Sequence, residues 1–306
     1  MKKGIALLIT LMFIMAITLS IGVGLSYTKR AQKSLSDENF LFQSDIILHD
    51  VLSLLKKSKD LQFVAKDKSG KAFNIFLAQS SFIPFESSGI TVTIEIKSAR
   101  SKFNPVTLMK VNSKKIDLPR VNLLREYFAR KQLNNTYVDI LLDGLGGVKA
   151  DLSYNSNIFN TKKMLFRDYI VSKKHLDEFN EFYKNSFYDN AISRINFENL
   201  FYYAKDTKGK YLIDLNHATQ DVWELMLNVN ALRAKELVLG EGSYSISNKV
   251  PLNKDELSML SNFQTSYEPQ MFLDVQVEIT QNKSSAKIAF EYDIKNTIGY
   301  NFSYEI

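Results

Sequence analysis

The side chains that most often carry chemistry are few in this sequence and widely spaced. Cysteine is absent, which excludes thiol catalysis, disulfide bonds and cysteine-based zinc sites. His49, His175 and His217 lie far apart and lack the spacing of a metal site, so we expect surface or capped side chains. There is no Gly-x-Ser-x-Gly nucleophile motif and no Gly-rich phosphate-binding loop. We therefore expect no catalytic activity.

Gly4 is the residue whose position most needs a chemical explanation. It follows two lysines and directly precedes an apolar run, in the sequence "MKKGIALLIT". Glycine at that edge weakens a helix, so a plain membrane anchor gains nothing from it. A peptidase that works at the membrane face, in contrast, needs an extended and unhindered residue there. The alternative is a plain anchor with an accidental glycine.

The apolar run from Ile5 to Thr28 contains 24 residues without a charge. As a helix it would be about 36 Å long, which is enough to cross a hydrocarbon core of roughly 30 Å. A secretory signal has a shorter apolar region of about 7–15 residues and a small-residue cleavage site, and no convincing site follows here. We predict a transmembrane helix over residues 5–28, with the basic leader, residues 1–4, in the cytoplasm and the folded bulk on the other side.

The leader "KKG", followed at once by "IALLI", resembles that of type IV pilin-like proteins. In that family a prepilin peptidase cuts after the glycine, and the new amino terminus is N-methylated. The resemblance implies a cut between Gly4 and Ile5 and methylation of Ile5. It also implies a single-pass protein of the bacterial inner membrane with its bulk in the periplasm.

One position departs from most pilins and narrows the resemblance. The fifth residue of the mature chain is usually a glutamate, but here it is Ile9. A carboxylate in a membrane is costly unless it is paired. In pilins this glutamate neutralises the terminal amine of a neighbouring subunit, and a chain with Ile9 does not offer that pairing. Within the type II secretion family, the K-type minor pseudopilin (general secretion pathway protein K family) lacks this glutamate and is placed at the tip of the assembly. The chain resembles that subtype.

The first predicted elements follow directly after the apolar run. Residues 29–57 contain no Pro or Gly, and apolar side chains recur at three- and four-residue spacing, which predicts an amphipathic continuation of the helix. These apolar residues are Phe40, Ile47, Val51, Leu54 and Leu55. Next, "LQFVAKD" and "KAFNIFLAQ" are expected to be strands around a turn at residues 68–70. "GITVTIEIKSA" alternates strictly, which is typical of a half-buried strand.

The periodicity then changes twice. Helical spacing dominates residues 119–269, as in "PRVNLLREYFARKQL" and "KKHLDEFNEFYKNSF", and alternation returns after Pro269. The predicted fold class is α+β, with the long N-terminal helix packed on an antiparallel sheet from residues 58–118 and 270–306. Residues 119–269 form an inserted all-helical lobe. K-type pseudopilins have this arrangement, and Phe103, Asn104 and Leu108 resemble their junction between sheet and lobe.

A second pattern points to a different function. "IDLNHATQDVWELMLNVNALRAKELV" resembles the helix-hairpin-helix of DNA-binding modules, whose Gly-x-Gly hairpin lets backbone N–H groups approach phosphate. Here the hairpin is Asn228-Val229-Asn230, whose side chains block that approach. We therefore favour structural packing, with Asn216 stabilising a turn. The expected core residues are Leu215, Ala218, Trp223, Leu225 and Leu232.

The resemblance to K-type pseudopilins also implies calcium in the helical lobe. The nearest match is "DGLGGVKAD", with Asp139 before it, but glycines stand where further carboxylates would be wanted. Calcium needs six to eight oxygen ligands. Asp143 and Asp151 are the candidate ligands, and no other cofactor is expected.

Charge gives no support for a nucleic-acid partner. The net charge is +6, but residues 120–306 carry 22 basic and 24 acidic side chains, so basicity is not concentrated. The sequence predicts a minor pseudopilin that caps the tip of a pseudopilus and takes part in protein export. Its expected partners are I- and J-type minor pseudopilins, other pseudopilins, prepilin peptidase and the membrane, with no small-molecule substrate. The alternatives are a pilin-like subunit of a competence or type IV pilus DNA-uptake machine, or a membrane-tethered DNA-binding protein or enzyme.

Overall fold

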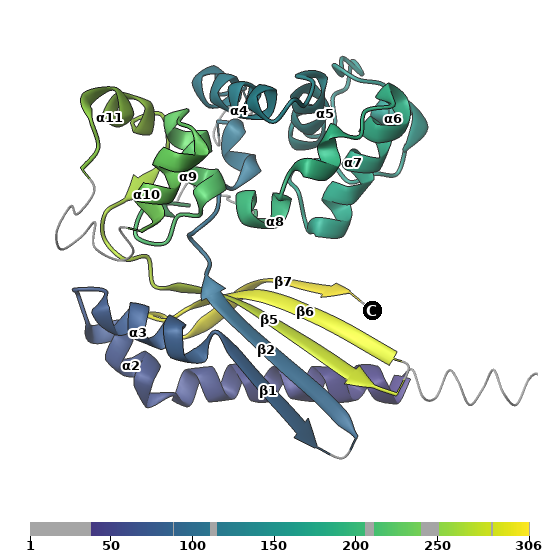
Figure 1. The fold of residues 1–306 in the computed structure, drawn as a ribbon. Helices are drawn as coiled ribbons and strands as arrows, with labels where there is room; N and C mark the ends of the chain where they lie inside the picture. The colour runs from purple at the N-terminus through teal and green to yellow at the C-terminus, as the bar shows by residue number, and fades with distance from the viewer. Residues whose placement is uncertain are drawn as a thin grey trace, which may run out of the picture.

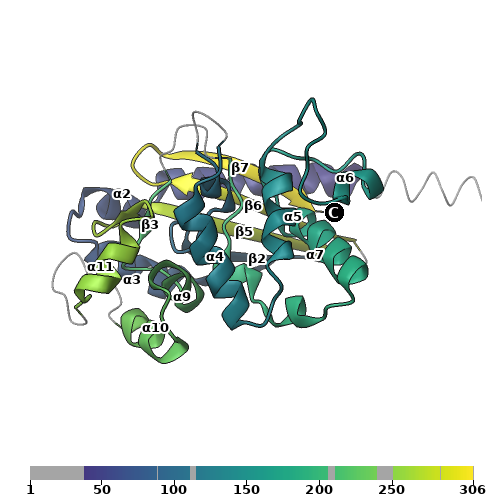
Figure 2. The same cartoon turned by 90° about the horizontal axis from the view of Figure 1, so that it is seen from above.

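The computed structural model describes residues 38–87, 89–110, 115–205, 211–239, 251–282 and 284–305. These residues form three layers, in which a sheet separates the N-terminal helix on one face from a helical lobe on the other (Figure 1). Seen from above, helices of the lobe lie across the strands (Figure 2). The fold class is therefore α+β with an antiparallel sheet, as predicted.

The sheet has five antiparallel strands in the order β1-β2-β5-β6-β7, so β2 pairs with a strand from the far end of the chain. Ile94 of β2 faces Val277, which faces Ile288 on the next strand. This register aligns β-branched side chains on the face toward the N-terminal helix and leaves polar ones toward the lobe. The strands are β1 (Phe82–Ser87), β2 (Ile90–Ser98), β5 (Phe272–Gln281), β6 (Ser284–Asp293) and β7 (Ile298–Glu305).

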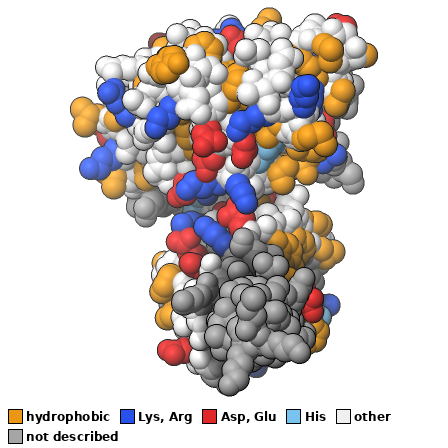
Figure 3. Space-filling model, turned by 90° about the vertical axis from the view of Figure 1, so that its right-hand side faces the viewer, with side chains coloured by type: hydrophobic (Ala, Val, Ile, Leu, Met, Phe, Trp, Pro, Cys, Tyr) orange, Lys and Arg blue, Asp and Glu red, His pale blue; other side chains and the backbone are white. Residues whose placement is uncertain are grey.

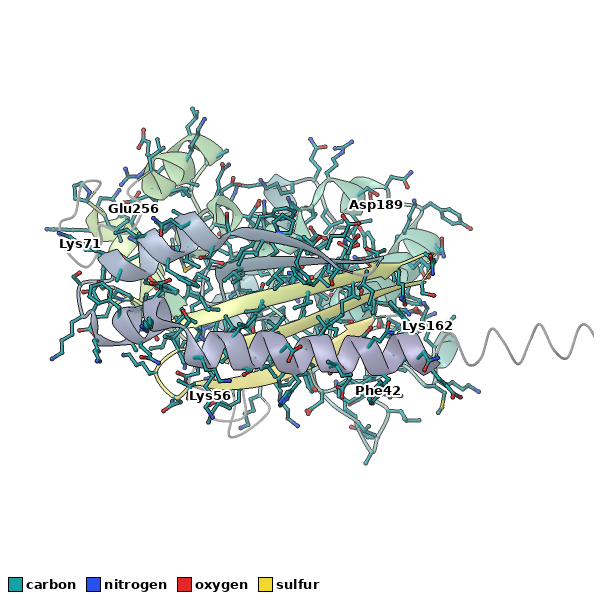
Figure 4. The ribbon with its side chains drawn as sticks, turned by 90° about the horizontal axis from the view of Figure 1, so that it is seen from below. Phe42, Lys56, Lys71, Lys162, Asp189 and Glu256 are labelled. Atoms are coloured by element: carbon teal, nitrogen blue, oxygen red, sulfur yellow. The ribbon has the colours of Figure 1, made fainter. Side chains whose placement is uncertain are left out.

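The N-terminal helix, described over residues 38–57, covers the strands from below (Figure 4). Its buried side chains recur every three or four residues, which is the spacing of one helix face. They share a hydrophobic core with the sheet. Leu54, expected on the buried face, is 67% exposed. The buried side chains are Phe40, Ser44, Leu48, Val51 and Leu55.

Residues 59–80 form two helices, α2 (Lys59–Lys66) and α3 (Lys71–Ser80), so the prediction of strands there is wrong. Ser58 caps α2 by accepting a hydrogen bond from the Leu61 N–H, and Leu61 and Val64 lie three residues apart on one buried face. Short apolar runs of this kind fit both periodicities, and in α2 the Ser58 cap favours the helix.

The turn between these two helices requires a glycine. Gly70 adopts a left-handed conformation with φ of 76°, and a Cβ atom there would lie 2.3 Å from Cγ of Pro269. The Asp67 carboxylate accepts hydrogen bonds from the Ser69 and Ala72 N–H groups, which lower the pKa of Asp67. The turn therefore both ends α2 and begins α3.

The strand that precedes β2 was not predicted from the sequence. All six residues of β1 are exposed, and it lies at an edge of the sheet, so "FIPFES" shows no alternation of buried and exposed side chains. The Ile96 N–H donates to the Ser81 carbonyl oxygen, so these two residues form a hydrogen-bonded pair. Hydrogen-bonded and non-hydrogen-bonded pairs alternate along an antiparallel ladder, so Pro84 falls in a non-hydrogen-bonded pair and its nitrogen points toward the free edge. An edge strand tolerates proline at such a position.

The lobe has its own hydrophobic core, which is separate from that of the sheet and rich in aromatic rings. Phe128 contacts the rings of Tyr137 and Phe197 at centroid distances of 5.4 and 6.3 Å. A parallel pair, β3 (Ile213–Asp214) with β4 (Thr265–Ser266), closes the lobe near the sheet. The helices are η1 (Pro105–Leu108), α4 (Leu118–Arg130), α5 (Thr136–Leu145), α6 (Ile158–Thr161), α7 (Lys173–Phe187), η2 (Ala191–Arg194), α8 (Phe197–Leu200), α9 (Gln220–Leu227), α10 (Ala231–Val238) and α11 (Lys254–Leu260).

Candidate functional site: the helix face, the neck and the lobe

The predicted processing residues Gly4, Ile5 and Ile9 lie outside the described residues, as does the predicted span 5–28. Among the residues that the structure describes, no helix is both long enough and apolar enough to cross a membrane. Processing and anchoring therefore remain predictions.

The outer face of the N-terminal helix carries apolar side chains that the described part of the chain leaves exposed. Phe42 is 67% exposed and Ile46 is 46% exposed, four residues apart and on the side opposite Ser44 and Leu48, which face the sheet. Phe42 lies near the N-terminal end of this helix (Figure 4). Because exposed apolar patches often mark sites of protein association, this outer face, Phe42 and Ile46, is a candidate contact surface.

The chain enters the lobe through residues 98–104 and returns through residues 267–272, and we call these two segments the neck. Arg100, in the neck, is 8% exposed and forms a two-pronged ion pair with Glu291 of β6, in which Nη1 lies 3.2 Å from Oε2. The Tyr202 hydroxyl donates to the same Oε2 at 2.8 Å. The Arg100 guanidinium also lies between the rings of Tyr211 and Phe272, 4.5 and 4.2 Å from their centroids. A buried charge pair thus links the lobe to the sheet.

The buried environment perturbs the groups of the neck. Burial raises the pKa of Glu291, while the Arg100 charge acts in the opposite direction. Burial also raises the pKa of the Tyr202 and Tyr211 hydroxyls well above their ordinary value. Both tyrosines therefore remain protonated hydrogen-bond donors at any physiological pH.

Asp214 of β3 joins the outgoing and returning segments of the neck through its backbone N–H and its carboxylate. The Asp214 N–H donates to the Arg100 carbonyl oxygen at 2.8 Å, and the buried Asp214 carboxylate accepts from the Gln270 N–H at 2.7 Å. Asn216 donates from its side chain to Asp214 and to the Tyr267 carbonyl oxygen, which confirms its predicted role in a turn. The neck is therefore fixed on both sides by hydrogen bonds.

A cleft of about 610 Å³ lies beside the neck, between the polar face of the sheet and the lobe. Its lining carries both signs of charge, and Figure 3 shows acidic and basic side chains gathered at the waist between the two parts. Lys173 and Glu198 pair within the lobe at 2.6 Å, and Lys102 of the neck lies 3.6 Å from Asp274 of the sheet. Mixed and paired charge does not favour binding of nucleic acid.

The helix-hairpin-helix pattern forms α9, a hairpin at residues 228–230 and α10. Asn228 is left-handed, with φ of 54°, and donates from its side chain to Glu126, while Asn230 caps α10 by accepting from the Arg233 N–H. The Arg233 guanidinium pairs with Glu256 at 2.7 Å. Both the cap and the nearby cation are therefore engaged inside the protein, which favours structural packing over phosphate binding.

The predicted core residues of this element are buried with one exception. Leu232 is 76% exposed, so its assignment to the core is wrong. Ala234 and Leu237 occupy the buried face of α10, and Leu232 falls on the other side of the helix. The buried members are Leu215, Ala218, Trp223 and Leu225.

His49 and His175 occupy a surface and a capping position, as predicted, whereas His217 is packed between the lobe and α3. His49 is exposed. The His175 ring accepts from the Val171 N–H at 3.2 Å and lies 3.0 Å from the Phe166 carbonyl oxygen, and burial lowers its pKa. The His217 ring packs edge-on against Phe73 of α3, with centroids 5.3 Å apart, which joins the lobe to the helical layer.

No protein-family model matches the sequence, and no curated protein matches it. The structure is similar to a chain in the crystal structure of the GspK-GspI-GspJ complex from the enterotoxigenic Escherichia coli type 2 secretion system. The TM-score is 0.55 at 12% identity, and the likeness covers 90% of this chain and 98% of that chain. The chain has a pseudopilin-like fold.

The two candidate calcium ligands named from the sequence, Asp143 and Asp151, do not form a common site. Asp143 is fully buried and faces hydrogen-bond donors of Asn155 and Ser156, while Asp151 is exposed and accepts from Ser153. Asp139 pairs with Arg125. Over the described ranges, no group of three or more His, Asp or Glu side chains could hold a metal ion. The donor set therefore does not fit calcium.

Sequence analysis missed the neck as a site. Glu291 looks like one more polar residue in the alternation "KIAFEYD", and Arg100 like the end of a strand. The available signal was the position of an arginine directly after the alternating strand, where the chain leaves the sheet. Its partner could not be found from one sequence, because the two residues are far apart along the chain.

Proposed function

We propose that this protein is a minor pseudopilin of a type II secretion system, in the role of the K-type subunit. The observation that supports this most strongly is the pseudopilin-like fold over nearly the whole length of both compared chains. Residues 5–28 would anchor the chain in the inner membrane with its bulk in the periplasm. Its task would be structural, without catalysis of its own, a small-molecule substrate or a nucleic-acid partner.

The amino terminus would be processed before assembly. Prepilin peptidase would cut between Gly4 and Ile5, and Ile5 would be N-methylated. Ile9 offers no carboxylate to a neighbouring terminal amine, so this subunit would not form the intramembrane ion pair that pilins use when a subunit is added.

The lobe would cap the tip of the pseudopilus. It covers the sheet on the face opposite the N-terminal helix, and the neck attaches it through a buried ion pair (Figure 1). A lobe held in this position would obstruct another subunit that tried to add above it. The helix, in contrast, would join the bundle formed by the other pseudopilins and so support protein export.

The I- and J-type minor pseudopilins would contact the outer face of the N-terminal helix. Phe42 and Ile46 are exposed there at helical spacing, and packing against a neighbouring helix would remove them from water. The GspK-GspI-GspJ structure is itself a complex of three such proteins, which supports partners of this class.

Co-purification tests this proposal. The full chain is co-expressed with the I- and J-type pseudopilins of the same organism, extracted in mild detergent and captured by a tag on its C-terminus. We expect both partners to be recovered with the wild type. Phe42→Glu should reduce their recovery about tenfold or more, because it places a charge in the buried contact.

The matched control introduces the same side chain elsewhere on the same helix. Lys56, near the C-terminal end, is exposed, and Lys56→Glu should leave recovery unchanged. Failure of the wild type to retain either partner would contradict the proposal. Loss of DNA uptake with normal secretion on deletion would instead place the protein in a DNA-uptake machine.

A further inference from the structure

Asp143 of α5 holds the loop between α5 and α6, residues 146–157, through hydrogen bonds to its buried carboxylate. Its carboxylate is fully buried in the last turns of α5 and accepts four hydrogen bonds. Oδ1 accepts from the backbone N–H and the side-chain amide of Asn155, at 2.9 and 3.0 Å. Oδ2 accepts from the backbone N–H and the hydroxyl of Ser156, both at 2.7 Å.

The rest of the loop is held by its own groups in the same way. The exposed Asp151 carboxylate accepts from the N–H and hydroxyl of Ser153, at 3.1 and 2.8 Å. The Tyr154 hydroxyl accepts from the Lys149 N–H at 2.9 Å and from Arg167 at 2.8 Å. The Arg167 guanidinium also lies 3.8 Å from the centroid of the Phe159 ring, which anchors the loop to α6.

A calcium ion would find no opening at Asp143. A carboxylate offers about four acceptor positions, and here four N–H and O–H donors occupy them. Calcium needs six to eight oxygens at roughly 2.3–2.6 Å, and donor hydrogens directed at the same carboxylate would repel it. Asp151 is turned to Ser153 and Asp139 to Arg125, so neither supplies a second ligand.

We infer that a clamp of hydrogen bonds, and not a metal ion, holds this loop, and that the lobe folds and keeps its shape independently of calcium. The Asp143 carboxylate acts as the centre of the clamp, and Asn155 and Ser156 are its arms. Burial of this carboxylate is tolerated because four donors solvate it in place of water. This inference concerns the lobe alone and does not rest on the proposed role in secretion.

Thermal unfolding with and without calcium tests the inference on the purified full chain in detergent. Trp223 is the only tryptophan and lies fully buried in the lobe, so its fluorescence reports the unfolding of that part. We expect the same midpoint in excess calcium chloride and in excess chelator. A midpoint raised by several degrees in calcium would overturn the inference.

Hydrogen exchange of the Ser156 amide tests the clamp itself. Asp143→Asn should speed this exchange about tenfold or more, because the new side-chain NH₂ group faces donors instead of accepting from them. Asp151→Asn, an identical change at the exposed carboxylate, should leave it within about twofold of the wild type. If Asp143→Asn does not fold, Ser156→Ala removes one of the four hydrogen bonds, that of the hydroxyl, and should give a smaller acceleration in the same direction. Unchanged exchange in Ser156→Ala and in a folded Asp143→Asn would contradict the clamp.

Discussion

The sheet with its N-terminal helix and the helical lobe bury their apolar residues in different ways. The core of the sheet is aliphatic and β-branched, with Val275, Val277 and Ile288 fully buried, while that of the lobe is built around aromatic rings such as those of Phe128 and Trp223. The two cores are separate clusters. The lobe contacts the rest of the protein through the Phe272 ring of β5, through the Phe73–His217 pair and through the polar groups of the neck, so loss of a single charge in the neck should weaken the coupling.

This difference bears directly on the proposed role. A pseudopilin-like part that packs with neighbours needs one apolar helix face, and a cap needs bulk held in a fixed position. The buried Arg100–Glu291 pair supplies that fixation without a shared core. A buried ion pair is poor evidence for net stability, but removal of one partner is costly, because the other charge is left unpaired.

Arg100→Ala should give the largest effect on this coupling. It leaves Glu291 buried without its cation, at a cost of about 3–5 kcal/mol in the free energy of unfolding. For the wild type we expect Trp223 fluorescence and far-ultraviolet circular dichroism to give the same denaturant midpoint. Because the two cores are separate, we expect two distinct midpoints in the variant. A single shared midpoint in the variant would show that the neck is not what couples the two parts.

The pH dependence of this variant sharpens the same test. Burial holds the pKa of Glu291 above its ordinary value, and Arg100 opposes that rise, so the variant should have a still higher pKa. A raised folded-state pKa means that the fold binds the proton more tightly than the unfolded chain. The loss of stability should therefore shrink as the pH falls from about 7 to about 5. As a control, Arg100→Ala combined with Glu291→Gln should recover part of the loss at neutral pH.

A smaller effect is expected within the lobe, at Glu256. Its carboxylate pairs with Arg233 and accepts from the Asn253 N–H at the start of α11, and the Arg233 hydrogen bond is the main cause of its lowered pKa. Glu256→Gln should cost about 2 kcal/mol at neutral pH, measured by Trp223 fluorescence in denaturant. With the neck intact, the midpoint from far-ultraviolet circular dichroism should fall together with that from Trp223 fluorescence, because the two parts unfold in one transition.

Acid should remove the difference between this variant and the wild type. A lowered folded-state pKa stabilises the protein above the ordinary glutamate pKa of about 4.3, and that stabilisation is lost as the pH falls through the lowered value. The two proteins should therefore converge in stability below about pH 4. A difference that stays constant across this range would show that the charge on Glu256 is not the cause.

The strands and helices with the clearest periodicity could be predicted from the sequence. Alternation of apolar and polar residues predicted β2 at residues 90–98 and the strands β5, β6 and β7 after Pro269. Helical spacing predicted α4 and α7. Residues 59–80 form helices where strands were expected, because their short apolar runs fit both the strand period and the helix period. The Arg100–Glu291 pair and the Asp143 clamp could not be predicted, because one sequence does not show which donors the fold brings to a buried carboxylate.

The mature amino terminus tests the central claim, that this protein is a processed minor pseudopilin, most directly. Intact-mass measurement on the protein extracted from its native membrane should give a chain that begins at a methylated Ile5 and retains residues 5–28. Replacement of Gly4 by phenylalanine should leave residues 1–4 attached. A wild-type chain that still carries Met1, or one that begins beyond Thr28, would contradict the account.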